Sequence, residues 1–194
     1  ISAVLRDAER RLTSTDSLDA NDRFKVYICN SSWRLFLRTG GTKIGGAADV
    51  LFTRTFVLRE SDINNNRLIP PAGTLSDEDA RPLSYFFAHE AAHILQSRRY
   101  GRFVQFSPQW LREGHADLTA KAGDFDPKEN YLRFRENDDF LSYERSGLYR
   151  EFHLMVYYVS KVEGKSFGEL YRSPPSADEI KKNMEASQSY FDQL

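Results

Sequence analysis

Hydrophobic and polar positions follow two different periods in the first third of the chain. In residues 1–12, apolar side chains recur every three to four positions and charged side chains fill the opposite face, which predicts a helix. Residues 23–30 alternate and are rich in strand formers, and residues 31–39 begin with two serines that suit a helix cap. Residues 45–60 predict extended chain, because glycines lead into β-branched and aromatic residues.

The rest of the chain is dominated by helical spacing. A turn-rich stretch, residues 61–82, is expected to be a long loop before a helix with Pro82 in its first turn and Gly101 at its end. Three further helices are expected at about 108–122, 145–163 and 176–190. Since strands come first and helices dominate afterwards, the predicted fold class is α+β.

Composition limits the class of protein. With 194 residues and 40% hydrophobic content, the chain is predicted to form a single domain over residues 1–194. Its 27 basic and 28 acidic residues leave a net charge near zero without long like-charged blocks, which argues against a dedicated nucleic-acid binder. No apolar run approaches the roughly 20 residues of a membrane-spanning helix. Cys29, the only cysteine, is expected to be a buried strand residue and permits no intrachain disulfide.

The most informative motif is "HEAAH", in which His89 and His93 flank Glu90 at metal-ligand spacing. On a helix, positions i and i+4 lie on one face about 5 to 6 Å apart, so both imidazoles can reach one metal ion. Glu90 sits beside that face, where it can act as general base on a water held by the metal. A helix that merely tolerates polar residues is the alternative interpretation.

A catalytic zinc site needs a third protein ligand, and "QWLREGHADLTAK" offers one. Glu113 and Asp117 are again four residues apart, and small residues at 114, 116 and 120 would let two helices approach closely. We expect Glu113 to complete the metal site and Asp117 to hydrogen-bond to a ligating histidine. His115 competes with Glu113, but it points about 200° away around the helix and is expected to be partly exposed. A solvated helix face is the plainer interpretation of the two carboxylates.

Together, "HEAAH" and "WLREGHAD" resemble the gluzincins, the zinc metallopeptidases that include thermolysin and the thermolysin-like aminopeptidases. The resemblance covers roughly residues 82–165. It implies a zincin-like fold, in which a small twisted mixed sheet packs on the active-site helix before a mostly helical C-terminal part. It also implies one zinc ion per chain, bound by His89, His93 and Glu113, with Glu90 as the base and Asp117 supporting a histidine.

A second, weaker part of the resemblance is "SGLYREFHLMVYYVSKVEGKSFGELY". Tyr149 stands where similar small bacterial proteins carry a tyrosine that opens a helix. A phenol there suits stabilisation of the oxyanion that develops during hydrolysis. His153 and Tyr157 follow at helical spacing and could share or replace this role. Core packing with a polar tip at the surface is the alternative.

These expectations favour an endopeptidase. The aminopeptidases of this group carry a glutamate that binds the substrate's free amine, and Ala48 stands at the corresponding place in "GGAAD". A strand near 44–52 could still bind an extended peptide at a sheet edge. The expected partner is therefore a peptide or protein substrate. The main alternative is a non-catalytic or degenerate zinc-binding domain that recognises a peptide or a cell-wall partner, and a third is a zinc hydrolase acting on another carbonyl. The chain starts at Ile1 without an initiator methionine, which is compatible with removal of a signal peptide, an anchor or other upstream sequence, and extracytoplasmic localisation is favoured by analogy alone.

Overall fold

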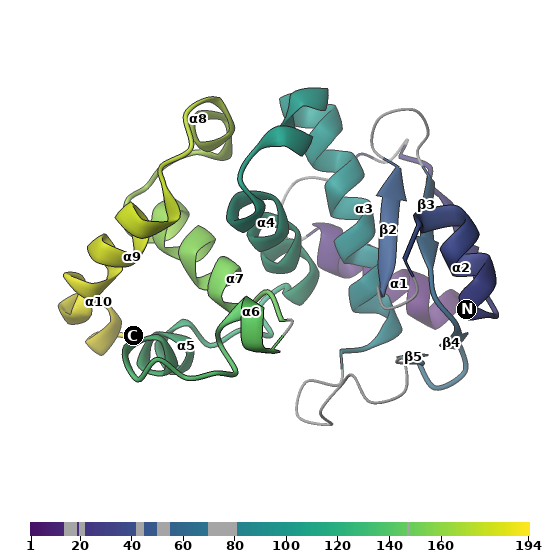
Figure 1. The fold of residues 1–194 in the computed structure, drawn as a ribbon, viewed down its shortest axis with the longest axis horizontal. Helices are drawn as coiled ribbons and strands as arrows, with labels where there is room; N and C mark the ends of the chain where they lie inside the picture. Colours follow the sequence, from purple (N-terminus) through teal and green to yellow (C-terminus); the bar gives the residue numbers. More distant parts are fainter. Residues whose placement is uncertain (14–18, 20–21, 42–44, 50–54, 70–80, 147) are drawn as a thin grey trace. The chain divides into compact units, whose positions relative to one another are not determined.

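The computed structural model describes residues 1–13, 19, 22–41, 45–49, 55–69, 81–146 and 148–194 (Figure 1). The backbone forms two compact units, Ile1–Arg102 and Phe103–Leu194. The first unit mixes helices with a small sheet, and the described part of the second unit is helical, so the predicted α+β class is confirmed. A single domain over residues 1–194 stays a prediction.

The first unit is built on a three-stranded mixed sheet. Strand β3 (Thr55–Leu58) lies in the middle, parallel to β1 (Lys25–Ile28) and antiparallel to β2 (Gly46–Asp49). Residues 50–54 of the predicted extended segment lie outside the described residues. The predicted loop at 61–82 contains a short antiparallel pair, β4 (Ser61–Asp62) and β5 (Arg67–Leu68), and its residues 70–80 also lie outside the described part.

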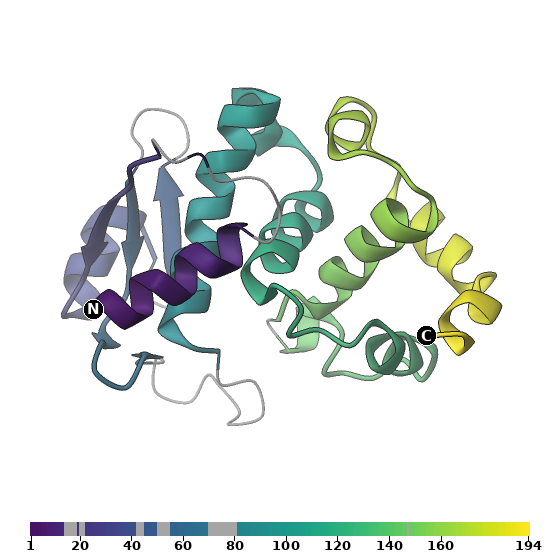
Figure 2. The same cartoon turned by 180° about the vertical axis from the view of Figure 1, so that it is seen from behind.

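Helices cover both faces of this sheet (Figure 1). Because side chains alternate along a strand, Phe56 and Val57 of β3 face opposite sides. The Phe56 ring packs edge-on against Phe87 of helix α3 (Leu83–Tyr100), and Val57 shares a buried cluster with Leu35 of helix α2 (Ser32–Thr39). Helix α1 (Ser2–Thr13) runs along α3, which Figure 2 shows from the other side. Cys29 is buried in the α2 cluster, directly after β1, as expected.

Helix α3 has the bounds that proline and glycine predicted. Pro82 is its N-cap residue, one position before the first turn, since a proline can precede the helix without losing an internal hydrogen bond. The helix ends at Gly101, whose φ of 93° is a conformation that residues with a side chain rarely adopt. Most of its residues are buried, including the first histidine and the glutamate of the motif.

The second unit contains more helices than the sequence predicted. Helix α4 (Gln109–Lys121) matches its predicted range, and α9 (Ala177–Glu185) and α10 (Gln188–Asp192) divide the last predicted helix. The predicted helix at 145–163 is divided as well, into α6 (Tyr143–Ser146), α7 (Arg150–Tyr157) and a wider π-helical turn, η3 (Tyr158–Val162). Three elements were missed: η2 (Arg102–Phe106), α5 (Pro127–Arg135) and α8 (Phe167–Arg172).

The missed helices α5 and α8 carry recognisable start signals. Asp126 caps α5 by accepting a hydrogen bond from the Glu129 N–H, and Pro127 follows it at the first helical position. Ser166 and Glu169 cap α8 reciprocally through side chain and backbone. Both helices are short, so their hydrophobic period is weak although their caps are strong.

Helices α4 and α7 pack very closely, and Gly114 makes this possible. A Cβ atom added at Gly114 would lie 2.3 Å from the Phe152 carbonyl oxygen. The sequence predicted that small residues here would let two helices approach closely, and the helix that Gly114 approaches is α7. Leu111 of α4 and Leu154 of α7 are both fully buried in the core of this unit.

Candidate metal centre

His89 and His93 lie on one face of α3, one turn apart. Their ring centroids are 4.9 Å apart and the rings are nearly perpendicular. His89 is buried, and its Nδ1 atom lies 3.4 Å from the Tyr85 hydroxyl one turn earlier. Such a contact restrains the orientation of a ring, as the partners of ligating histidines do in metal sites. His93 is half-buried.

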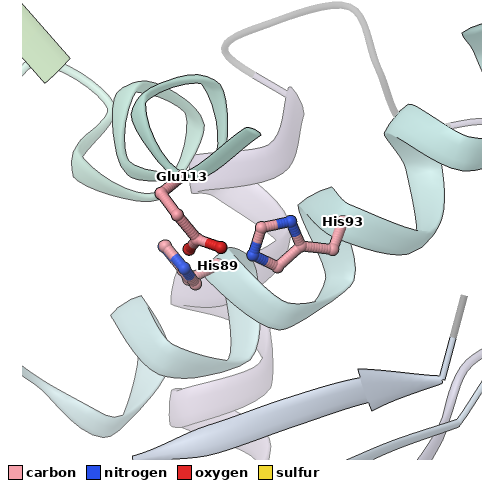
Figure 3. A group of neighbouring side chains, drawn as sticks. All are labelled: His89, His93 and Glu113. Atoms are coloured by element: carbon pink, nitrogen blue, oxygen red, sulfur yellow. The ribbon is translucent and has the colours of Figure 1, made fainter. Parts of the chain in front are cut away.

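Glu113, on α4, completes a group of three possible ligands with these histidines. Each side chain offers one ligand atom, and the three atoms lie within 4.8 Å of one another. Figure 3 shows the Glu113 carboxylate and the two imidazoles turned toward a common point. The carboxylate is half-buried. The sequence predicted this triad, and these are the residues that the structure brings together.

The triad fits a zinc ion in both chemistry and size. Two imidazole nitrogens and one carboxylate oxygen are a ligand set found in catalytic zinc sites, which keep a fourth position for water or substrate. Zinc-ligand distances of about 2.1 Å place tetrahedral ligand atoms about 3.4 Å apart. Ligand atoms within 4.8 Å of one another therefore need only small side-chain rotations to reach that spacing.

Glu90 lies against strand β2. Its side chain is buried, and a Cβ atom added at Gly46 would be 2.7 Å from the Glu90 Oε1 atom. The same Cβ would be 2.7 Å from Cδ2 of Leu58, which is fully buried. The absence of a side chain at Gly46 thus leaves the space that the Glu90 carboxylate occupies. Sequence reasoning placed Glu90 at the site but did not predict this contact with β2.

Asp117 is buried at 1% exposure and lies beside His153 and Lys121 of its own unit. One carboxylate oxygen lies 2.8 Å from the His153 Nδ1 atom and 3.6 Å from the Lys121 Nζ atom. The His153 ring stacks on Phe125 with centroids 3.6 Å apart. Burial lowers the pKa of His153, and the Asp117 carboxylate opposes that shift. Support of a ligating histidine by Asp117 stays a prediction, and its pairing with His153 was not anticipated.

His115 is not the partly exposed residue that the sequence suggested. It is buried, its ring stacks on Phe167 with centroids 3.6 Å apart, and its Nδ1 atom lies 3.1 Å from the Tyr171 hydroxyl. The error arose because α8, which supplies both aromatic partners, was missed. His115 therefore belongs to the core of the second unit, and the ligand group contains Glu113 instead.

The candidate oxyanion donors Tyr149, His153 and Tyr157 lie along α7, from its N-cap residue to its last residue. Tyr149 is its half-buried N-cap residue, and its ring stacks on Tyr143 with centroids 5.3 Å apart. The Tyr157 hydroxyl lies 3.5 Å from that of Tyr190, and burial raises the Tyr157 pKa to about 12. The role of Tyr149, or of His153 in its place, stays a prediction.

Strand β2 contains the last four residues of the sequence "GGAAD", including Ala48. Ala48 pairs with Phe56, and β2 stands at one end of the strand order among the described residues.

No helix among the described residues of the chain is long and apolar enough to cross a membrane. Comparison of the chain with protein-family models, with curated proteins and with solved structures gave no match. Membership of the gluzincins accordingly stays a prediction that depends on His89, Glu90, His93, Glu113 and Asp117.

Proposed function

We propose that this protein is a zinc-dependent peptidase with a zincin-like fold, and that it cleaves internal peptide bonds. The observation that carries the proposal is the group formed by His89, His93 and Glu113, whose ligand atoms lie within 4.8 Å of one another. These residues hold the metal, and a buried glutamate, Glu90, follows the first of them in the chain. A purely structural zinc site has no need of such a base.

The chain's own residues supply the proton transfers and the charge stabilisation. When bound, zinc acts as a Lewis acid that polarises the substrate carbonyl and brings the pKa of water toward neutrality. Glu90 accepts the proton of the attacking water at its carboxylate and delivers it to the nitrogen of the leaving amine. The Tyr149 hydroxyl donates a hydrogen bond to the oxyanion that develops on the attacked carbonyl. No residue becomes covalently attached to the substrate.

Strand β2 supports an endopeptidase over an aminopeptidase. The strand stands at the end of the sheet order and lies against Glu90 through Gly46, so an extended peptide added along it would run past the base. Ala48 has no side-chain carboxylate that could bind a free amine. Backbone hydrogen bonds along β2 do not require a free chain end, so internal segments of a substrate can bind there. Specificity then depends on the pockets that accept the substrate's side chains.

The test is a peptide-library digest with three variants. Glu90→Gln keeps the shape of the side chain and removes the base, so it should retain about one zinc per chain and lose turnover by at least about a hundredfold. Glu113→Ala should lose most of its zinc. Glu136→Gln, which changes an exposed carboxylate of the second unit, is the matched control and should behave as wild type. Unchanged cleavage by Glu90→Gln would refute the role of the base, and full zinc retention by Glu113→Ala would refute the triad.

A further inference from the structure

Helix α2 presents an apolar face that is exposed among the described residues of the first unit. Trp33, Phe36 and Leu37 are 61%, 52% and 71% exposed, whereas Leu35 on the opposite side is buried. At about 100° per residue, the three exposed side chains fall within an arc of about 100°. Large apolar side chains grouped in this way on a surface mark a binding site more often than isolated ones do.

Basic side chains border this face. Arg34 and Arg38 are exposed and follow next around the helix, and the guanidinium of Arg34 lies 5.5 Å from the centroid of the Trp33 ring. Arg38 and Lys25 both lie over the ring of Tyr27, at 4.1 and 5.7 Å. Between Asp22 and Asp49 the sequence contains five basic residues and no acidic one. Arg34, Arg38 and Lys25 therefore give the described surface beside the apolar face a positive charge that is complementary to an anionic partner.

We propose that α2 binds an anionic lipid surface. Its apolar arc, which includes a tryptophan, inserts at the boundary between headgroups and acyl chains, and Arg34 and Arg38 contact lipid phosphates. Interfacial helices combine these features, an aromatic and aliphatic face beside a cationic one. In this arrangement the eight residues of α2 lie flat on the membrane.

The lipid-binding face does not depend on the candidate metal centre. Helix α2 packs on the side of the sheet reached by Val57, and α3 packs on the side reached by Phe56. The base and the two histidines are on α3, so a lipid surface held by α2 meets the opposite face of the sheet from them. Membrane binding would then anchor the protein without covering those side chains.

Tryptophan fluorescence tests the proposal directly, because the chain has two tryptophans and Trp110 is buried. The intact protein is titrated with vesicles of phosphatidylcholine alone or mixed with phosphatidylserine. Mixed vesicles should shift Trp33 emission to the blue, and brominated acyl chains should quench it. Added salt should weaken binding. Since each basic residue contributes about fivefold in lipid affinity, Arg34→Gln with Arg38→Gln should bind about 25-fold more weakly.

Two further variants separate insertion from simple charge attraction. Phe36→Ser with Leu37→Ser keeps the charges and the reporter, and it should abolish quenching by brominated chains. The control is Phe103→Ser with Phe106→Ser, which removes the other strongly exposed aromatic pair and should leave binding unchanged. Equal binding to both kinds of vesicle, or no change in Trp33 emission, would overturn the proposal. So would concentration-dependent self-association through Trp33 without vesicle binding, which would assign the face to a second copy of the chain.

Discussion

Substitution of Gly46 by alanine tests whether the contact between β2 and Glu90 sets the position of the base. The new Cβ would lie 2.7 Å from both Glu90 Oε1 and Leu58 Cδ2. Ordinary contacts of a methyl group are about 3.5 Å, so a neighbour must move by about 0.8 Å. Leu58 is fully buried, whereas the carboxylate is the end of a flexible side chain. Because both contacts are 2.7 Å, movement of one neighbour does not relieve the other, so Leu58 and Glu90 must both shift, and the shift of Glu90 displaces the base.

The expected cost is in turnover. A misplacement near 1 Å can lower the rate about a hundredfold, so kcat should fall by about 10- to 100-fold, equivalent to about 1.4 to 2.7 kcal/mol in the activation barrier. Zinc content should stay at about one per chain, since Gly46 contributes no ligand atom. Crowding in the sheet should also lower the free energy of unfolding by about 1 to 3 kcal/mol.

The assay combines kcat on the best library peptide, metal content and urea denaturation. Gly168→Ala is the matched control, because the new methyl group would meet nothing within 4 Å and helix α8 should be stabilised by up to about 1 kcal/mol. Combined with Glu90→Gln, the Gly46 substitution should lower the residual rate no further. Wild-type kcat in folded Gly46→Ala, or an equal loss on the Glu90→Gln background, would refute the reasoning.

Two further predictions concern stability, one for each unit. Gly114→Ala would place a Cβ 2.3 Å from the Phe152 carbonyl oxygen, a backbone atom that cannot rotate away, so unfolding in urea should show a loss of about 3 kcal/mol or more; a loss below about 1 kcal/mol would contradict the close α4–α7 contact. Burial of Asp7 raises its pKa, but hydrogen bonds from Ser84, Arg10 and Arg11 outweigh burial and lower the pKa from 3.8 to about 2. A lowered carboxylate pKa stabilises the fold above pH 4, and this contribution is lost as the pH falls toward 2. Asp7→Asn should therefore cost about 1 kcal/mol at neutral pH, after allowance for partial solvent screening, and clearly less at pH 2, where about half of the Asp7 carboxylates are protonated; an equal cost at both pH values would argue against the ionised network.

The elements that the sequence predicted best are those with unambiguous ends or a long hydrophobic period. Helix α3 lies between Pro82 and Gly101, and α4 keeps its period over 13 residues. Helices α5 and α8 are short, and their apolar residues serve tertiary contacts that no local period reveals. Their caps at Asp126 and Ser166 were the available signal.

The ligand group could be predicted because metal chemistry restricts residue type and spacing. His89 and His93 share a face at i, i+4, and Glu113 follows twenty residues after His93 with a second carboxylate, Asp117, one helical turn beyond it. The contacts around the group were harder to predict. Pairing of Asp117 with His153 and stacking of His115 on Phe167 depend on how distant helices pack, and these partners are 36 and 52 positions away in the chain.

Anomalous diffraction at the zinc edge, from crystals of the zinc-loaded protein, tests the central claim most directly. The account predicts one anomalous peak per chain, within about 2.0 to 2.2 Å of a ring nitrogen of His89, a ring nitrogen of His93 and a carboxylate oxygen of Glu113. A peak that lacks Glu113 among its ligands, or no peak near the two imidazoles, would contradict it.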